Sequence, residues 1–300
     1  MSEQKTRAGF VAILGAPNVG KSTLMNKMVG AKVSIVSPKV QTTRTRVLGI
    51  CMAGPSQIIF VDTPGIFKPK RRLDRAMVAA AWGGGKDADM TALLVDAERG
   101  LDANTRSIIE RLKDQNKKVM LVVNKVDLVK KPALLTLVET LSAQDIFTDV
   151  FMVSAETGDG VDDLTAFLAN AVPEGPWLYP EDQISDMPMR LLAAEVTREQ
   201  IYLQLHQELP YAVTVETEKW EDQSDGSHRV EQVIYVERPG QKAIVLGKGG
   251  SRIKALGEAA RKELGAILDS PVHLFLFVKV REKWGDDPDR YRDWGLDYNA

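Results

Sequence analysis

Short hydrophobic runs alternate with helix-like patterns along the first half of the chain. The runs hold four or five residues, many of them β-branched, which is too short for a typical helix and typical of buried strands. They are Phe10–Leu14, Ile58–Val61, Ala92–Val95, Val119–Val123 and Val150–Val153. Helical patterns cover Lys21–Val29, Asp102–Gln115, Pro132–Ala143 and Val161–Ala171. This alternation predicts an α/β domain over residues 1–173, with a mostly parallel sheet and helices on both faces.

The alternation ends at a proline-rich stretch, PEGPWLYPEDQISDMP, whose four prolines break helices and sheet ladders alike. We take residues 174–188 as a linker. The pattern beyond it predicts a second domain, of the α+β class, over residues 189–285, and then a tail over 286–300. The elements expected in this domain are a helix over Met189–His206, strands over Tyr211–Trp220 and Arg229–Glu237, a helix over Ser251–Ile267 and a strand over Val272–Val280.

Composition and charge exclude several classes of protein. The chain is 44% hydrophobic and 27% charged, as in ordinary globular proteins, and its single cysteine excludes an internal disulfide. No run reaches the roughly 18 apolar residues of a membrane span. The net charge of −2 excludes a uniformly basic nucleic-acid binder, but residues 242–283 hold nine basic and four acidic side chains, and residues 286–300 hold two basic and five acidic ones. The contrast favours a polyanionic partner for the basic region and leaves the acidic tail as either a disordered end or a regulatory segment.

A glycine-rich loop, GAPNVGKS, follows the first predicted strand and opens the first predicted helix. This is the G-x-x-x-x-G-K-[ST] pattern in the context that the motif requires. Its backbone N–H groups and the helix N-terminus can surround a phosphate chain. Lys21 can then reach the β- and γ-phosphates, and Ser22 can hold Mg²⁺. The residues expected to contact the triphosphate are Gly15, Ala16, Pro17, Asn18, Val19, Gly20, Lys21 and Ser22.

Three further motifs each follow a predicted strand, at the edge where open α/β sheets bind ligands. In DTPG, Asp62 is placed to hold Mg²⁺ through water, and Gly65 can offer its N–H to the γ-phosphate. In NKVD, Asp127 can accept hydrogen bonds from guanine N1–H and the 2-amino group, which adenine lacks. In SAE, the Ala155 N–H can face the guanine O6. These motifs add Asp62, Thr63, Pro64, Gly65, Ile66, Asn124, Lys125, Asp127, Ser154, Ala155 and Glu156 to the predicted nucleotide site.

These motifs, from Phe10 to about Ala171, resemble the TRAFAC class of GTPases. The resemblance implies guanine specificity, Mg²⁺ dependence and GTP hydrolysis. It also places the first switch at Gln41, Thr42, Thr43, Arg44 and Thr45. Either Thr42 or Thr43 would close over Mg²⁺ when the γ-phosphate is present, and we favour Thr43. The metal ligands are then Ser22, Thr43 and Asp62, and the residues expected to act in hydrolysis are Lys21, Thr43, Gly65 and Asn18.

One position departs from the Ras-like pattern. Ras-like members carry a glutamine after the DxxG glycine, and it orients the attacking water. Here that residue is Ile66, which cannot form a side-chain hydrogen bond. Asn18 stands where related GTPases with this P-loop bind K⁺, and a cation there would neutralise developing phosphate charge. Asn18 either binds K⁺ in this way or only stabilises the loop.

A second glycine-rich loop, VLGKGGSRIK, has a G-x-x-G but neither the spacing nor the ending of the first. With the helices expected around it, it is similar to the signature of KH domains, and the α-β-β-α-α-β order fits the type II arrangement. In that fold the loop clamps a single-stranded nucleic-acid backbone. The RNA-binding residues implied are Gly247, Lys248, Gly249, Gly250, Arg252, Ile253 and Lys254. Val245, Leu246 and Ile253 either form an apolar groove for bases or serve as core.

A P-loop GTPase domain followed by a type II KH domain is the arrangement of a family of bacterial ribosome-assembly GTPases, which the chain resembles over essentially its whole length. The resemblance implies that GTP or GDP, the 3′ region of 16S ribosomal RNA and the 30S subunit are partners. It also implies a cytoplasmic monomer that associates peripherally with the inner membrane. A C-terminal domain that docks a protein or a membrane is the alternative. A departure from the family is the glycine triplet Gly83–Gly85, which predicts a flexible helix end.

Overall fold

The computed structural model describes residues 5–39, 42–205 and 209–300, and it divides into two compact units. The first unit holds the chain up to Ser34, Thr43–Asp186 and Tyr291–Ala300. The second holds Ile35–Thr42 and Met187–Arg290. Over the described part of the chain, we find no helix with the length and hydrophobicity that crossing a membrane requires.

The first unit is built on a six-stranded sheet in the order β2-β3-β1-β4-β5-β6. Its strands are β1 (Arg7–Gly15), β2 (Val47–Ala53), β3 (Ser56–Asp62), β4 (Met90–Asp96), β5 (Val119–Asn124) and β6 (Phe147–Val153). All neighbours are parallel except β2 and β3, so the mostly parallel α/β sheet is confirmed. β2 is not among the predicted strands, because it joins β3 through a tight hairpin and a pattern of alternating strands and helices does not anticipate it.

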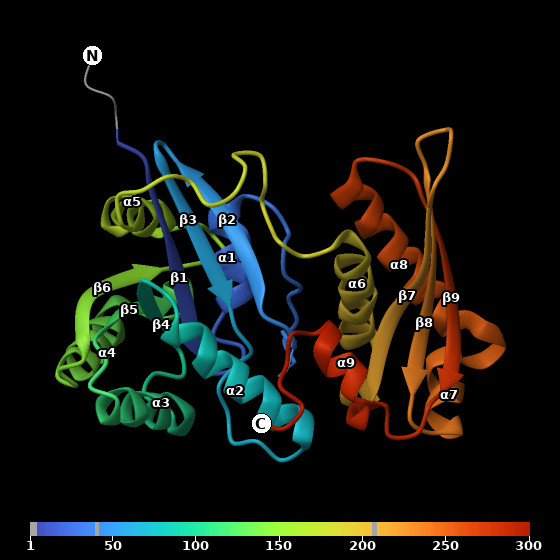
Figure 1. The fold of residues 1–300 in the computed structure, drawn as a ribbon. Helices are drawn as coiled ribbons and strands as arrows, with labels where there is room; N and C mark the ends of the chain where they lie inside the picture. Colours follow the sequence, from blue (N-terminus) through green and yellow to red (C-terminus); the bar gives the residue numbers. More distant parts are fainter. Residues whose placement is uncertain (1–4, 40–41, 206–208) are drawn as a thin grey trace. The chain divides into compact units, whose positions relative to one another are not determined.

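Helices cover both faces of this sheet, as Figure 1 shows, with α1 and α5 on one side and α2 and α3 on the other. They are α1 (Lys21–Val29), α2 (Arg72–Lys86), α3 (Ala103–Asp114), α4 (Lys131–Ser142) and α5 (Val161–Ala171). α3 illustrates why they form. Asp102 caps its first turn by accepting the Thr105 N–H at 2.7 Å, and its buried residues, Thr105, Ile108, Ile109 and Leu112, recur at helical spacing.

The glycine triplet lies in the last turn of α2, which ends one residue later, at Lys86. The helix end therefore falls where it was expected, and two of the three glycines also have a packing role. A β-carbon on Gly84 would lie 3.0 Å from Thr63 Cγ2, and one on Gly85 would lie 3.2 Å from Leu14 Cδ1. Glycine lets α2 approach the ends of β1 and β3 closely, beside the predicted phosphate loop. Gly83 differs from both, because nothing lies within 4 Å of its β-carbon position.

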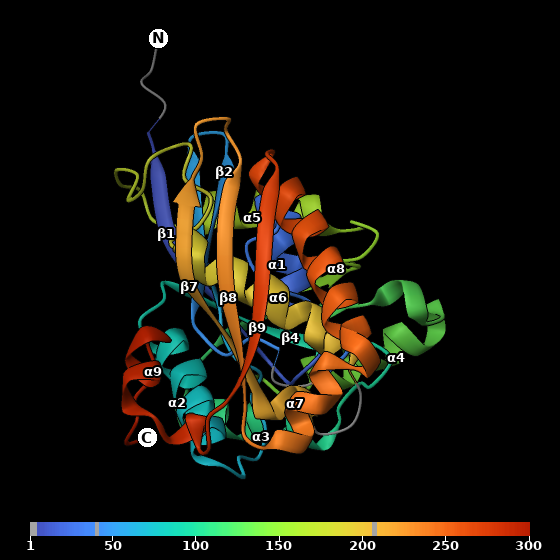
Figure 2. The same cartoon turned by 90° about the vertical axis from the view of Figure 1, so that its right-hand side faces the viewer.

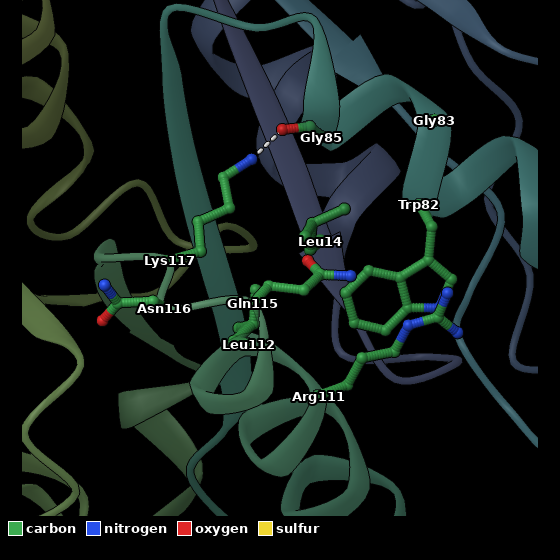
Figure 3. A pocket seen from close by; sticks show the side chains of 9 residues that line it. All are labelled: Leu14, Trp82, Gly83, Gly85, Arg111, Leu112, Gln115, Asn116 and Lys117. Atoms are coloured by element: carbon green, nitrogen blue, oxygen red, sulfur yellow. Dashed lines mark hydrogen bonds between the residues drawn. The ribbon is translucent and has the colours of Figure 1, made fainter.

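The same stretch of α2 lines a pocket of about 630 Å³ between α2 and α3 (Figure 3). Leu14, the residue before Gly15 of the phosphate loop, is part of its lining. The Arg111 guanidinium lies 4.2 Å from the centre of the Trp82 ring, and the Lys117 amine donates to the Gly85 carbonyl. These two contacts tie α3 and the loop after it to the C-terminal half of α2.

Alanine substitutions in the triplet should show separately how helix propensity and close packing affect the stability of the protein. Gly83→Ala adds a methyl group in open space and should stabilise the protein by roughly 0.5–1 kcal/mol, because alanine loses less backbone entropy in a helix. Gly84→Ala places the same methyl group against Thr63 and Val61, so the gain should vanish or reverse. Thermal unfolding of both variants checks this. A Gly83→Ala protein that melts no higher than Gly84→Ala would contradict the packing role.

The second unit has the predicted α-β-β-α-α-β order. Its elements are α6 (Met189–Gln204), β7 (Val213–Asp222), β8 (His228–Val236), α7 (Pro239–Leu246), α8 (Ser251–Leu268) and β9 (Val272–Val280). The first helix ends at Gln204, and its expected last residue, His206, lies outside the described residues. β8 lies between β7, its antiparallel neighbour, and β9, its parallel neighbour. Figure 2 shows this sheet with α6 and α8 packed on one face, over a core that includes Ile201, Val213, Ile234, Leu256 and Val278.

The division of the chain differs from the expected boundaries at the C-terminus. Residues 286–300 were expected to form an acidic tail, but they contain a short helix, α9 (Pro288–Asp293), and two buried apolar side chains, Tyr291 and Leu296. These side chains pack against Ala76 and Met77 of α2. The net charge of the segment does not predict this packing, because the acidic residues are mostly exposed while apolar residues between them are buried.

Candidate nucleotide site and nucleic-acid interface

The phosphate loop connects β1 to α1 and is held by its neighbours from both sides. Gly20 lies in the left-handed region at φ 97°, and a β-carbon there would lie 2.2 Å from the Asn124 amide nitrogen, so only glycine fits. The Ile66 N–H donates to the Gly15 carbonyl at 3.0 Å, and a β-carbon on Gly65 would lie 2.8 Å from Pro17 Cα. The DTPG motif and the loop are thus packed backbone to backbone.

Asn124 connects three of the predicted motifs. Its amide nitrogen donates to the Val19 carbonyl at 2.8 Å, and its carbonyl oxygen accepts the Ala155 N–H at 2.9 Å. The phosphate loop, NKVD and SAE therefore meet at one buried side chain. Ser154 is fully buried, and its hydroxyl accepts the Thr157 N–H at 3.2 Å, which closes the SAE turn. Asp127 and Glu156, at the edge of the same site, are exposed.

Three oxygen atoms converge where the metal is expected. Ser22 Oγ lies 2.7 Å from Asp62 Oδ2 and 3.0 Å from Thr43 Oγ1, and Thr43 Oγ1 lies 3.4 Å from the same carboxylate oxygen. Asp62 is fully buried, and its Oδ1 has no hydrogen-bond partner among the described residues. Mg²⁺ prefers hard oxygen ligands, and this site offers two hydroxyl oxygens and a carboxylate with one unsatisfied oxygen. Waters and phosphates are the usual remaining ligands of Mg²⁺. The residues present therefore fit the metal that the motifs imply.

Lys21 and Asp62 are buried charges that the site leaves incompletely compensated. Burial lowers the pKa of Lys21 to about 8, while the Asp62 carboxylate opposes the shift. Burial likewise raises the pKa of Asp62, against the effects of Lys21 and of the Ser22, Ser34 and Thr43 hydroxyls. The Lys21 amine donates to the Gly15 and Ala16 carbonyls at distances of 3.4 and 3.2 Å, which are long for a charged donor. A bound triphosphate with Mg²⁺ would supply the missing opposite charge to both groups.

The structure distinguishes the two candidate switch threonines. Thr43 faces Ser22 and Asp62, as described above. Thr42 belongs to the other unit, where its hydroxyl contacts the Lys39 carbonyl and Ser37 Oγ, each at 2.7 Å, and its carbonyl accepts a hydrogen bond from Arg198. The geometry therefore supports Thr43 as the metal-binding residue. The other predicted switch residues divide into Arg44 and Thr45, which are buried, and Gln41, which lies outside the described residues.

Several residues of this site carry no sequence signal of their own. Ser34 donates to Asp62 Oδ2 at 3.0 Å. Asp96, at the end of β4, accepts the Lys125 amine at 2.6 Å, and that amine also reaches the Asn18 carbonyl at 2.9 Å. Arg99 donates to the Pro17 carbonyl at 3.1 Å. Only the position of Asp96 at a strand end could have drawn attention to it.

The second glycine-rich loop joins α7 to α8 in the second unit. Gly247 (φ 72°) allows a tight turn, since a β-carbon there would lie 2.7 Å from Arg252 Cβ. Gly249 (φ 60°) and Gly250 (φ 77°) face open space. Lys248 and Lys254 are exposed, while the Arg252 guanidinium donates to the Ile244 carbonyl at 2.9 Å and closes the end of α7. The loop thus presents open backbone and two exposed lysines to solvent.

A groove of about 350 Å³ lies beside this loop, between α8 and β9. Ile253 and Lys254 line it at the loop end, and Arg261 lines it further along α8. The apolar residues at the loop divide between the core and the groove. Val245 is fully buried core, Leu246 and Ile253 pack partly against that core, and Ile253 also faces the groove.

Family models match both parts of the chain. One described as a 50S ribosome-binding GTPase matches residues 10–125, and one described as a KH domain matches residues 208–285. GTPase Era of Brucella suis biovar 1 (strain 1330) is 61% identical over 98% of this chain and 94% of its own length. GTPase Era of Rhizobium meliloti (strain 1021) is 62% identical over 98% of this chain and 94% of its own length.

Two solved structures are similar to the whole chain. One is Era in complex with MgGDPNP and nucleotides 1506–1542 of 16S ribosomal RNA, and the other is a point variant of Aquifex aeolicus Era bound to GDP·AlF4⁻. Each has a TM-score of 0.91 and 38% identity, and each match covers 97% of this chain and 99% of the solved chain. Both the GTPase architecture and the KH architecture predicted from the sequence are thereby confirmed.

Proposed function

Because the chain belongs to the Era family of GTPases, we propose that it is a Mg²⁺-dependent GTP switch that binds the 3′ region of 16S ribosomal RNA and assists assembly of the 30S subunit. The observation that carries this proposal is the convergence of Ser22, Thr43 and Asp62 beside Lys21, in a chain whose second unit presents the GKGG loop. The Era structure with MgGDPNP and 16S RNA nucleotides supports both halves of it.

The nucleotide site performs its chemistry mainly by positioning charge. Ser22 and Thr43 would hold Mg²⁺, with Asp62 behind them, and the metal would neutralise charge on the β- and γ-phosphates. Lys21 adds a buried positive charge beside the same phosphates, and the Gly65 N–H is available to the γ-phosphate. Ile66 is 7% exposed and apolar, so it cannot orient water. Hydrolysis in the isolated protein should therefore be slow unless another group assists it.

We expect K⁺ to supply part of this assistance through Asn18, whose backbone is held in the left-handed region at φ 64°. GTP turnover should be roughly tenfold faster in KCl than in NaCl at equal ionic strength, because a cation beside the transferring phosphate stabilises its developing charge. A phosphate-release assay measures this. Asn18→Ala should turn over GTP at the same rate in both salts, whereas equal rates in the parent protein would show that Asn18 only stabilises the loop.

RNA binding by the second unit is best tested with the RNA itself. Filter-binding titrations with a single-stranded RNA that carries the 3′ end of 16S ribosomal RNA should give tighter binding with a GTP analogue than with GDP. Affinity should also fall as salt rises, because lysines at the loop attract phosphates. The absence of RNA binding in either nucleotide state would favour the alternative, a protein or membrane partner. That alternative draws on Phe275 and Phe277, which are 42% and 50% exposed on β9.

The proposal also has the protein acting as a monomer in the cytoplasm, with loose contact to the inner face of the membrane. Sedimentation of the purified protein tests the first point, and fractionation of cells with a salt wash tests the second.

A further inference from the structure

The C-terminal segment Tyr291–Ala300 follows the KH domain in sequence but packs on α2 of the GTPase domain. Tyr291 is fully buried and Leu296 is 6% exposed, and both lie against Ala76 and Met77. Trp294 and Tyr298 flank this cluster, together with Leu73 and Ala80 of α2. We call Tyr291–Ala300 the C-terminal clamp, because it covers the apolar face of α2 along the first half of that helix.

The clamp has a defined internal structure. The Tyr291 and Tyr298 rings meet edge to face with centroids 5.0 Å apart, and the Leu296 N–H donates to the Tyr291 carbonyl at 2.7 Å. The Arg72 guanidinium, in the first turn of α2, lies 4.3 Å from the centre of the Tyr298 ring. A solvated tail would not bury its aromatic side chains in this way, so the segment is a folded part of the unit.

The residue just before the clamp is anchored in the KH domain. Arg290 is 4% exposed, forms an ion pair with Glu216 of β7 at 2.6 Å, and lies 4.7 Å from the centre of the Tyr235 ring of β8. Arg290 and Tyr291 are consecutive residues of the same helix, α9. The boundary between the two units therefore falls between two consecutive residues, with Arg290 packed within the KH unit and Tyr291 within the GTPase unit.

α2 is the element through which the nucleotide state should be felt. It begins soon after Gly65 and Ile66, and Gly84 near its other end packs against Thr63. Its start is fixed by Asp74, whose carboxylate accepts the N–H groups of Lys70 and Arg71, each at 3.0 Å. A change at the γ-phosphate that moves the DTPG segment would therefore shift α2, and with it the surface that the clamp covers.

We propose that the C-terminal clamp couples the nucleotide state, through α2, to RNA binding by the KH domain. The inference rests on the proposed function, and it assigns the coupling to Tyr291 and Leu296, which act as positioning residues on α2. Thermodynamic linkage requires that the coupling between GTP binding and RNA binding is reciprocal. If GTP tightens RNA binding through the clamp, RNA tightens GTP binding by the same factor.

The test compares a double variant, Tyr291→Ala with Leu296→Ala, with a control in the same segment, Asn299→Ala, whose side chain is exposed. The RNA affinity is measured by filter binding with a GTP analogue and with GDP. We expect a ratio of roughly tenfold in the parent and control proteins and a ratio near one in the double variant. Amide hydrogen exchange across residues 76–80 of α2 should rise about tenfold in the double variant alone, which reports release of the clamp.

A double variant that shows faster exchange in α2 but keeps the parent ratio overturns the proposal. A parent protein that turns over GTP and binds RNA with equal affinity in both nucleotide states overturns it as well, together with the switch behaviour, but leaves GTP hydrolysis and RNA binding standing. A parent protein that binds no RNA overturns both this proposal and the proposed function.

If the double variant does not fold, Tyr298→Ala serves in its place, because it removes the ring beside Arg72 and keeps the buried side chains of Tyr291 and Leu296. A ratio lowered in step with faster exchange then supports the clamp, and an unchanged ratio overturns it.

Discussion

Replacing Lys21 by alanine is expected to lower the affinity for GTP roughly a hundredfold and to abolish measurable turnover, because the charge-assisted hydrogen bonds of one buried amine are lost. Within the protein this amine donates to the Gly15 and Ala16 carbonyls, at 3.4 and 3.2 Å. Burial lowers its pKa to about 8 although the Asp62 carboxylate opposes the shift, so the protein compensates its charge only in part. The charge therefore serves a ligand and contributes little to the stability of the fold.

The control for this substitution is Lys27→Ala, which removes an exposed lysine from the same helix, α1. Titration with a fluorescent GTP analogue gives the affinities, and thermal unfolding without nucleotide gives the stabilities. The melting temperatures of both variants without nucleotide should stay within a few degrees of the parent protein. GTP affinity within threefold of the parent in Lys21→Ala would mean that the amine does not reach the phosphates.

Replacing Lys248 and Gly249 together by aspartate is expected to reduce RNA affinity at least a hundredfold and leave the basal GTPase rate unchanged. The loop lies in the second unit, and the nucleotide site lies in the first. The net charge changes by about three units where the RNA phosphates would lie, and the backbone is open there because nothing lies within 4 Å of a β-carbon on Gly249. Aspartate tolerates the left-handed conformation of Gly249 better than most residues, so the loop should keep its course.

A matched control makes the same change in charge at the far edge of the same sheet. Lys219→Asp with Gln223→Asp alters β7 and the turn after it, whereas the loop and groove border α8 and β9. The control should lose much less RNA affinity than the loop variant, since its charges lie two strands away from β9 and salt screens exposed charges over about that distance. Equal losses in both variants would indicate general electrostatic attraction by the domain and would contradict a specific role for GKGG.

Much of this architecture could be predicted from local pattern. Each of the five hydrophobic runs forms a strand, because a short apolar run between turn signals can be buried in a parallel sheet and has few other stable options. The phosphate loop, Ser22 and Asp62 could be located from the sequence, because each belongs to a short motif that directly follows or ends a recognisable strand. The KH order of elements followed in the same way, although the G-x-x-G alone is too short to be specific.

Other features depended on contacts between distant residues. The choice of Thr43 over Thr42 follows from which side of the chain faces Asp62, and adjacent threonines in a loop give no periodic signal. The close approach at Gly84 involves Thr63, twenty-one residues earlier in the sequence. Ser34, Asp96 and Arg99 support the site only because folding brings them there. β2 was not predicted, since a hairpin strand resembles any apolar stretch until its partner is known.

The sequence by itself determined the two domains, the guanine-nucleotide motifs and the basic glycine-rich loop, because these properties reside in short segments whose local physics is the same in any surroundings. Only the tertiary structure decided how the last residues, 286–300, are arranged. Their charge favours either a disordered end or a regulatory segment, whereas the burial of Tyr291 and Leu296 depends on a complementary apolar face of α2 more than two hundred residues earlier. Charge is a property of one segment, whereas burial is a property of two segments that meet.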